Sequence, residues 1–173
     1  QGKVYQRVHP TLVKKSSYIA GINGVLNAVI IDGKPVGKNI IQGEGAGPSA
    51  TTSALVSDIS SIMRGNIKFP FSISNSKRKK ISSGDISKLY FSSYIRLKVK
   101  DKYGVLSAVT KIFSDNKVSI KRVLQSPYKN KNSSSIIIIT HSSRDSDIKK
   151  TLKTLVKKSY IIQKPKLLRI END

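Results

Sequence analysis

The strongest constraint on the fold is a regular alternation of strand and helix patterns between residues 94 and 170. Residues 94–100 (YIRLKVK) alternate apolar and cationic side chains, which is the period of a half-buried strand. Residues 105–113 (VLSAVTKIF) have apolar side chains at the spacing of one helix face, and residues 148–156 (IKKTLKTLV) repeat this pattern. The remaining apolar runs predict strands over residues 118–125 and 135–140, and one last strand that covers residues 160–162 and, past Pro165, residues 167–170.

In chain order these elements form a βαββαβ succession, which is the ferredoxin-like arrangement. Right-handed crossovers place both helices on one face of a single antiparallel sheet. We therefore predict a small domain over residues 91–173. The preceding residues 66–90 are rich in Ser, Asn and Lys and show no sustained period, so we interpret them as a linker.

The first 65 residues predict a less self-contained segment. Extended pieces are expected over residues 4–13, 25–31 and 36–42, followed by a glycine-rich loop at 43–47 and a helix that ends near Arg64. The expected apolar side of that helix is formed by Ala54, Leu55, Ile59, Ile62 and Met63. Three short strands and one helix bury little surface, so residues 1–65 resemble the end of a larger α/β domain. The predicted fold class is α+β, an incomplete α/β segment followed by a ferredoxin-like domain.

The composition limits the possible chemistry. The chain has 173 residues with no Cys and two His, His9 and His141, so thiolate zinc sites, disulfides and cysteine nucleophiles are excluded and no metal centre is expected. Neither His has a nucleophile or carboxylate partner in the sequence pattern, and no complete catalytic set is present. The longest apolar run, residues 136–139, is too short to cross a membrane, and the opening lacks an apolar signal segment. We expect a soluble, cytoplasmic protein.

The formal net charge is +22. A strongly basic chain raises the hypothesis of nucleic-acid binding, for which the dense run Lys77–Lys80 (KRKK) is the candidate. However, only 7 of the 32 cations are Arg, and Lys, Ile and Asn are abundant together, which favours an A/T-rich codon bias spread over a solvated surface. The chain opens with Gln1 instead of Met, so we expect a processed or truncated product.

Two backbone sites are candidates for ligand binding. The loop GEGAG (residues 43–47) leads into a helix, and bare amides at a helix N-terminus suit a phosphate, a carboxylate or the amide of a nicotinamide. The turn DKYGVL (residues 101–106) links a strand to a helix in the same way and suits the carboxylate of an amino acid. A tight turn without any ligand has the same pattern, so both alternatives stay open at each site. The spacing of the loop matches neither the dinucleotide fingerprint nor a P-loop.

Taken together, the stretches resemble the C-terminal part of homoserine dehydrogenase followed by its regulatory ACT domain. The matching stretches are RVHPTLV (7–13), NGVLNAV (23–29), GEGAG (43–47) with Thr51, Ser53, Ala54, Val56 and Asp58, then residues 94–97, 101–106, 119–125 and 136–141. The similarity covers nearly the whole chain except residues 66–90. Three positions depart from the family pattern, because Tyr18, Ala50 and Tyr103 stand where Pro is common.

The resemblance implies an oxidoreductase that reduces L-aspartate 4-semialdehyde to L-homoserine with NADH or NADPH, on the route to threonine, methionine and isoleucine. In that family a Rossmann domain and the catalytic Lys and acidic residues precede the stretch that begins here. The resemblance assigns Gly45, Ala46 and Gly47 to nicotinamide contact and no catalytic residue to this chain. We therefore expect the 173 residues alone to be inactive.

The resemblance further implies a homo-oligomer whose ACT domain binds an amino-acid effector, with threonine as the expected ligand. The effector residues would be Asp101, Gly104, Val105 and Leu106. Two other interpretations of the same sequence remain, a non-enzymatic ACT-type amino-acid sensor and a basic nucleic-acid-binding protein.

Overall fold

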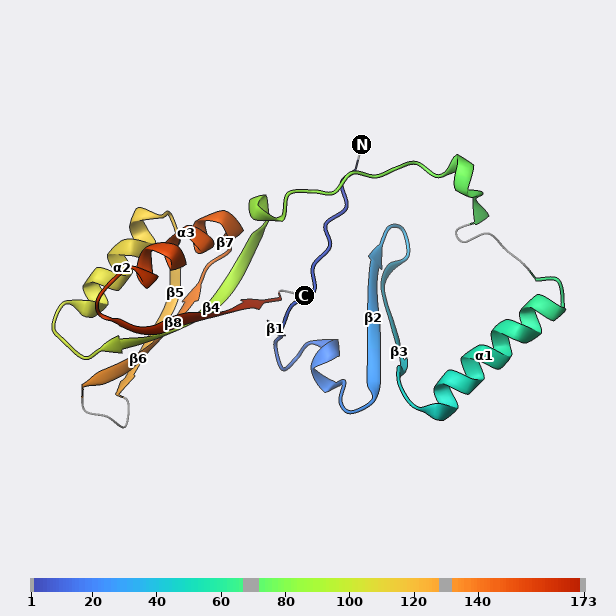
Figure 1. Ribbon diagram of the computed structural model, residues 1–173, viewed down its shortest axis with the longest axis horizontal. Coiled ribbons are helices and arrows are strands. Elements are labelled where there is room, and N and C mark those ends of the chain that lie inside the picture. The colour runs from blue at the N-terminus through green and yellow to red at the C-terminus, as the bar shows by residue number, and fades with distance from the viewer. Residues whose placement is uncertain (1, 67–71, 128–131, 172–173) are drawn as a thin grey trace. The chain divides into compact units, whose positions relative to one another are not determined.

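The computed structural model describes residues 2–66, 72–127 and 132–171 (Figure 1). The chain forms two compact units, one made of Gln1–Lys14 with Ile81–Asp173 and the other of Lys15–Lys80. Four parts of the sequence-based predictions lie outside the described residues, namely Gln1, residues 67–71 of the expected linker, residues 128–131 before the third strand of the ferredoxin-like domain, and residues 172–173 at the end of that domain.

The first unit contains the predicted ferredoxin-like domain. Its elements are β4 (Tyr90–Lys100), α2 (Val105–Asp115), β5 (Ile120–Pro127), β6 (Ser133–Thr140), α3 (Asp145–Val156) and β8 (Ile161–Ile170). The strands are neighbours in the order β8-β4-β6-β5, and each neighbouring pair is antiparallel. Both helices cover the same face of the sheet (Figure 1). The fold class and the βαββαβ order predicted from the sequence are confirmed.

The core lies between this sheet and the two helices. Ile95, Leu97 and Val99 of β4 are at most 1% exposed, while the cationic residues between them lie on the opposite face, as the strand period requires. The buried apolar residues are Ile95, Leu97, Val99, Val105, Val109, Ile112, Phe113, Val118, Ile136, Ile138, Ile148 and Leu155. The alternation in the strands and the helical spacing in α2 and α3 therefore point to one common interior.

Two short strands add to this sheet: one lies within the extended piece expected over residues 4–13, although its pairing with this domain was not predicted, and the other was not predicted. β1 (Thr11–Leu12) pairs in parallel with the edge strand β8, and β7 (Ser143–Arg144) pairs with the start of β4. The Thr11 hydroxyl donates a hydrogen bond to the Arg169 carbonyl at 3.0 Å, and the Glu171 N–H donates to the Leu12 carbonyl at 2.9 Å. The N-terminal residues thus extend the sheet of the ferredoxin-like domain by one edge strand.

The second unit is a hairpin and a helix. β2 (Leu26–Gly33) and β3 (Gly37–Glu44) pair antiparallel in unbroken register, η1 (Tyr18–Gly21) precedes them, and α1 (Pro48–Met63) follows. The predicted strands and helix are present, but β3 extends to Glu44, so the expected glycine-rich loop shortens to residues 45–47. The 3-10 turns η3 (Asn75–Lys77) and η4 (Ile86–Lys88) lie in the expected linker.

The second unit leaves most of its apolar side chains in solvent. No residue of α1 is buried, and Leu55, Ile59 and Ile62 on its expected apolar side are 56–62% exposed. In the hairpin, Val29 and Ile41 are 58% and 62% exposed. A surface of this kind marks a region that packs against further protein.

Candidate functional site

The clearest site is a cleft where β4 passes into α2. It has a volume of about 720 Å³ and is lined by Asp101, Lys102, Tyr103, Gly104, Leu106 and Gln125. β4 ends at Lys100, and Gly104 at φ 80° adopts the left-handed conformation that reverses the chain into the helix. A left-handed turn favours glycine because it has no Cβ to clash with the backbone.

Backbone hydrogen bonds hold this turn on both sides. The Lys100 N–H donates to the Tyr160 carbonyl at 2.9 Å, and the Asp101 N–H donates to the Asn132 carbonyl at 3.0 Å. The Val105 N–H donates to the Lys102 carbonyl at 3.3 Å. The turn is therefore fixed by neighbouring segments before any ligand is present.

The cleft has the chemistry to hold a small zwitterion. No side chain caps the N-terminus of α2, so backbone N–H groups of its first turn and the positive end of the helix dipole can meet a carboxylate. The carboxylate of Asp101 can accept from an ammonium group, while Leu106, 38% exposed, offers an apolar contact. The arrangement fits an α-amino acid better than a phosphate, because an acidic side chain lines the same cleft.

The structure brings three of the four predicted effector residues to this cleft. Asp101, Gly104 and Leu106 line it, whereas the Val105 side chain is only 8% exposed and packs in the core. Gln125 lines the cleft from β5, and its amide also donates to the Ser134 hydroxyl at 3.3 Å. The prediction missed Gln125 because the pairing of β5 beside β6 was not used, although residue 125 ends the predicted strand.

The second predicted site, residues 45–47, lies in the hairpin–helix unit. The Gly45 N–H donates to the Val25 carbonyl at 3.1 Å, and a Cβ at Gly45 would lie 1.7 Å from the Asn27 amide nitrogen. Gly47 has φ 119°, a conformation open almost only to glycine, and its carbonyl accepts from both the N–H and the hydroxyl of Thr51. Ala46 and both glycines are exposed.

This loop gives a helix N-terminus without a side-chain cap, with Pro48 as the first helical residue. Gly47 is favoured by its φ angle, whereas a Cβ at Gly45 would only need the exposed Asn27 side chain to move. The loop is therefore able to present bare backbone to a ligand. It lies in a different compact unit from the α2 cleft.

The two histidines differ in their surroundings. His9 Nδ1 lies 2.9 Å from the Pro10 carbonyl, so this ring makes a local hydrogen bond. His141 is exposed, and its backbone N–H donates to the Ser119 carbonyl. Within the described residues, no group of three or more acidic or His side chains is placed to hold a metal ion.

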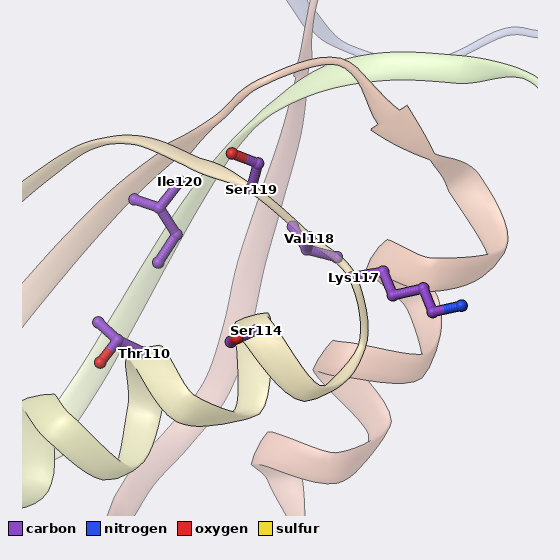
Figure 2. Close-up of a pocket in the computed structure, with 6 residues that line it drawn as sticks. All are labelled: Thr110, Ser114, Lys117, Val118, Ser119 and Ile120. Carbon is purple, nitrogen blue, oxygen red and sulfur yellow. The ribbon is translucent and has the colours of Figure 1, made fainter.

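A second cavity of about 450 Å³ lies at the C-terminal half of α2 (Figure 2). Its lining residues are Thr110, Ser114, Lys117, Val118, Ser119 and Ile120. The Thr110 hydroxyl already donates to the Leu106 and Ser107 carbonyls, and Figure 2 shows the Lys117 side chain extending away from Thr110. The cavity thus presents no converging set of charged groups among these lining residues.

A buried charged cluster of the first unit is centred on Asp145, the first residue of α3, which is 3% exposed. Its Oδ1 accepts from Arg169 at 2.5 Å and pairs with Arg7 at 3.5 Å, and its Oδ2 lies 2.7 Å from Lys149 Nζ. Both guanidinium groups also lie over the Phe91 ring, at 4.3 Å for Arg7 and 5.6 Å for Arg169. The sequence analysis did not predict this cluster, because Arg7 and Arg169 are both far from Asp145 along the chain.

Burial raises the pKa of Asp145, but hydrogen bonds and charges from Lys149 and Arg169 outweigh burial, so the net pKa lies below its ordinary value. Burial, followed by the neighbouring Arg169 charge, lowers the pKa of Arg7. Asp145 is therefore ionised at neutral pH and is held by three cations.

Comparisons with known proteins match both halves of the chain. Residues 2–60 match the homoserine dehydrogenase family and residues 93–159 match the ACT domain family. The homoserine dehydrogenase of Helicobacter pylori is 30% identical over 96% of this chain. The chain therefore resembles homoserine dehydrogenases that carry an ACT domain. It spans 39% of the length of the Helicobacter pylori relative and 40% of the Bacillus subtilis homoserine dehydrogenase, which is 28% identical.

A solved structure agrees with this resemblance. The homoserine dehydrogenase of Thiobacillus denitrificans has 25% identity and a TM-score of 0.85, covering 99% of this chain and 40% of its own. The resemblance to homoserine dehydrogenase with an ACT domain, expected from the sequence, is confirmed. Within the described residues, no helix of this chain is long and apolar enough to cross a membrane.

Proposed function

We propose that this chain is part of an NAD(P)-dependent homoserine dehydrogenase that reduces L-aspartate 4-semialdehyde to L-homoserine in the cytoplasm. The observation that supports it most is the order of two family matches along one chain, homoserine dehydrogenase at residues 2–60 and ACT at residues 93–159. In this proposal the cofactor supplies the hydride. The described residues supply backbone groups that line part of the cofactor site, together with a regulatory domain, and no catalytic side chain is assigned to them.

In the proposed enzyme, Gly45, Ala46 and Gly47 contact the nicotinamide end of NADH or NADPH. An exposed loop in which Gly47 has a positive φ, followed by an uncapped helix N-terminus, fits a ligand that approaches the backbone closely. Hydrogen-bond donors at this loop would orient the nicotinamide amide. The ribose and adenine would be held by a Rossmann domain encoded elsewhere in the enzyme.

The exposed apolar side chains of α1 and the β2–β3 hairpin support packing of this unit against the rest of a catalytic domain and a second subunit. Ile62 of α1 and Ile41 of β3 are each 62% exposed, which is costly for a surface that stays in water. We propose that a homo-oligomer covers this surface. The same packing would bring the loop at residues 45–47 to the cofactor.

The ACT domain of the proposed enzyme binds an amino acid in the α2 cleft, with threonine as the feedback effector. Its carboxylate would accept from backbone N–H groups at the start of α2, and its ammonium group would face Asp101. The hydroxyl of threonine could reach the Gln125 amide. Val105 would contribute through its position in the turn and not through its side chain, which is buried.

A chimera tests the catalytic proposal. Residues 1–173 replace the matching part of the Helicobacter pylori homoserine dehydrogenase, and NAD(P)-dependent oxidation of L-homoserine is measured. We expect activity in the chimera and none in the 173 residues alone. A chimera that folds, by circular dichroism, yet has no activity would contradict the proposal.

Two glycine substitutions in the chimera test the loop at residues 45–47. Gly47→Ala should reduce the activity, because φ 119° is strained for any residue with a Cβ. Gly43→Ala is the control and should leave the activity unchanged, because Gly43 has no positive φ and a Cβ added to it would meet nothing within 4 Å. Equal activity of the two variants would contradict a role for the loop.

Calorimetry tests the effector proposal on the 173-residue chain. We expect saturable threonine binding with NMR shift changes at Gly104, Leu106 and Gln125. Gln125→Leu should weaken it, and Gln42→Leu, an exposed change in β3, should not. Threonine binding combined with an inactive but folded chimera would favour the amino-acid sensor over the enzyme.

A further inference from the structure

The open face of the ACT sheet is cationic and has no acidic residue. No Asp or Glu occurs in β4, β5, β6 or β8 as the structure defines them. The helices cover the face that contains Leu97, so Arg96 and Lys98 of β4 lie on the other face. Lys166 of β8 pairs opposite Arg96 and therefore shares that face.

A small pocket of about 40 Å³ concentrates this charge. Its lining residues are Arg96, Leu97, Lys98, Ser135, Gln163, Lys164 and Lys166. Four of the seven are cations, and the polar remainder consists of a hydroxyl and an amide. This pocket is separate from the α2 cleft, which is lined by other residues.

A β-bulge produces the pocket. Arg96 pairs with Lys166 and Lys98 with Gln163, so Lys164 and Pro165 both lie opposite the single residue Leu97. Pro165 has no N–H to donate to β4, which explains why the ladder is irregular here. In a regular strand residue 164 would face away from 163, whereas the bulge lets 163, 164 and 166 line one pocket.

The cationic side chains of this pocket repel one another unless an anion binds between them. Arg96 and Lys166 are direct cross-strand neighbours, and like charges in that position destabilise a sheet. Within the described part of the chain, Arg96, Lys164 and Lys166 form no ion pair. Arg169, three residues further along β8, is instead paired with the buried Asp145. The pocket thus differs from the neighbouring cationic site, because its lining residues include no acidic side chain.

We propose that this pocket binds a phosphate group. A phosphate has several oxygens that accept hydrogen bonds. The pocket offers matching donors, which are the guanidinium group of Arg96, the ammonium groups of the lysines, the Ser135 hydroxyl and the Gln163 amide. The pocket is small enough for one such group. The proposal is independent of the enzyme activity proposed above, because it concerns only the ACT sheet.

The half-buried ring of Tyr94 lies on the same face, two residues before Arg96, and pairs across the ladder with Ile139 on one side and Leu168 on the other. An aromatic ring among apolar neighbours can stack on a nucleobase. The phosphate source can therefore be a free phosphate or a nucleotide, and binding experiments distinguish the two.

Pyrophosphate titration of the 173-residue chain by calorimetry at low ionic strength tests the site. The double variant Arg96→Gln/Lys166→Gln should weaken pyrophosphate binding about tenfold or more. The matched control Lys79→Gln/Lys150→Gln removes the same charge at exposed positions outside the pocket and should change affinity less than about twofold. Absence of saturable binding, or an equal loss in both variants, overturns the proposal.

NMR of the unchanged chain gives an independent check that does not depend on a variant. Pyrophosphate should shift the amide signals of Arg96, Lys98 and Lys164, and shifts confined to the Lys77–Lys80 run would overturn the proposed location. Tighter binding of ADP than of pyrophosphate, lost in Tyr94→Leu, supports the site with a nucleotide as its ligand. Equal binding of both supports the site with free phosphate or pyrophosphate as its ligand.

Discussion

Arg7 Nη2 lies 3.5 Å from Asp145 Oδ1, so a side chain near the start of the chain pairs with the first residue of α3. Along the N-terminal segment, one backbone contact lies before Arg7 and another lies after it. The Val4 N–H donates to the Ser82 carbonyl at 3.1 Å, and β1 pairs with β8. Residues 4–12 are therefore held against the rest of the first unit at three points.

Removal of the Asp145 charge should destabilise the first unit. Asp145→Asn leaves Arg7 and Arg169, whose side chains are only 17% and 15% exposed, close together without a counter-charge. We expect the free energy of unfolding in urea to fall by about 3 kcal/mol, the scale of a buried ion pair that loses one partner. Asp115→Asn is the control, because its pair with Lys111 is exposed and should change stability by less than about 0.5 kcal/mol. Equal effects of the two substitutions would contradict a special role for the cluster.

The same carboxylate should make stability depend on pH. The folded-state pKa of Asp145 is below its ordinary value. The contribution of this carboxylate to the free energy of unfolding is therefore complete above the unfolded-state pKa of about 4, and it is lost as the pH falls through the folded-state pKa. We expect the free energy of unfolding to decline below about pH 5, with a shallower decline in Asp145→Asn. Part of the decline should remain, since hydrogen bonds from Ser87 also lower the pKa of Asp85. Superimposable pH profiles of the two proteins would contradict this assignment.

Local periodicity was sufficient to predict the ferredoxin-like domain, and the resemblance to a known family added its assignment as an ACT domain. The alternation in residues 94–100 and the helical spacing in residues 105–113 each indicate which side chains are buried, without information from distant residues. The structure contains both the strand and the helix. The turn at Gly104 was predictable for the same reason, because one glycine between a strand and a helix fixes the geometry of the cleft. The local pattern marked residues 101–106 as a candidate turn, and the resemblance to a known family singled out Asp101, Gly104 and Leu106 within it.

Features that depend on long-range pairing were not predictable. Gln125 reaches the cleft only through the register of β5 beside β6, and the pairing of Thr11 with Arg169 joins opposite ends of the chain. The bulge at Pro165 required knowledge of which strand lies opposite. The burial of Asp145 likewise depends on two arginines from distant segments, so helix-end charge preference alone could not reveal it.

Attachment of the N-terminal segment depends on the absence of a side chain at Gly84. A Cβ there would lie 2.1–2.6 Å from ring atoms of Tyr5, so Gly84→Ala should push Tyr5 aside. The Gly84 N–H donates to the Val4 carbonyl at 2.8 Å, and we expect amide exchange at residues 4 and 84 to accelerate about tenfold. Gly2→Ala is the control, since nothing lies within 4 Å of that position. Unchanged exchange in Gly84→Ala would show that Tyr5 does not hold the segment in place.

The left-handed turn at Gly104 should link stability to effector binding. Gly104→Ala meets no steric contact within 4 Å, so its cost comes only from φ 80° and should be about 1 kcal/mol in the free energy of unfolding. Because the turn sets the first amides of α2, the same substitution should weaken threonine binding measured by calorimetry. Gly21→Ala, which also meets nothing within 4 Å but has no positive φ, should alter neither quantity. Undiminished threonine binding in Gly104→Ala would place the effector away from this turn.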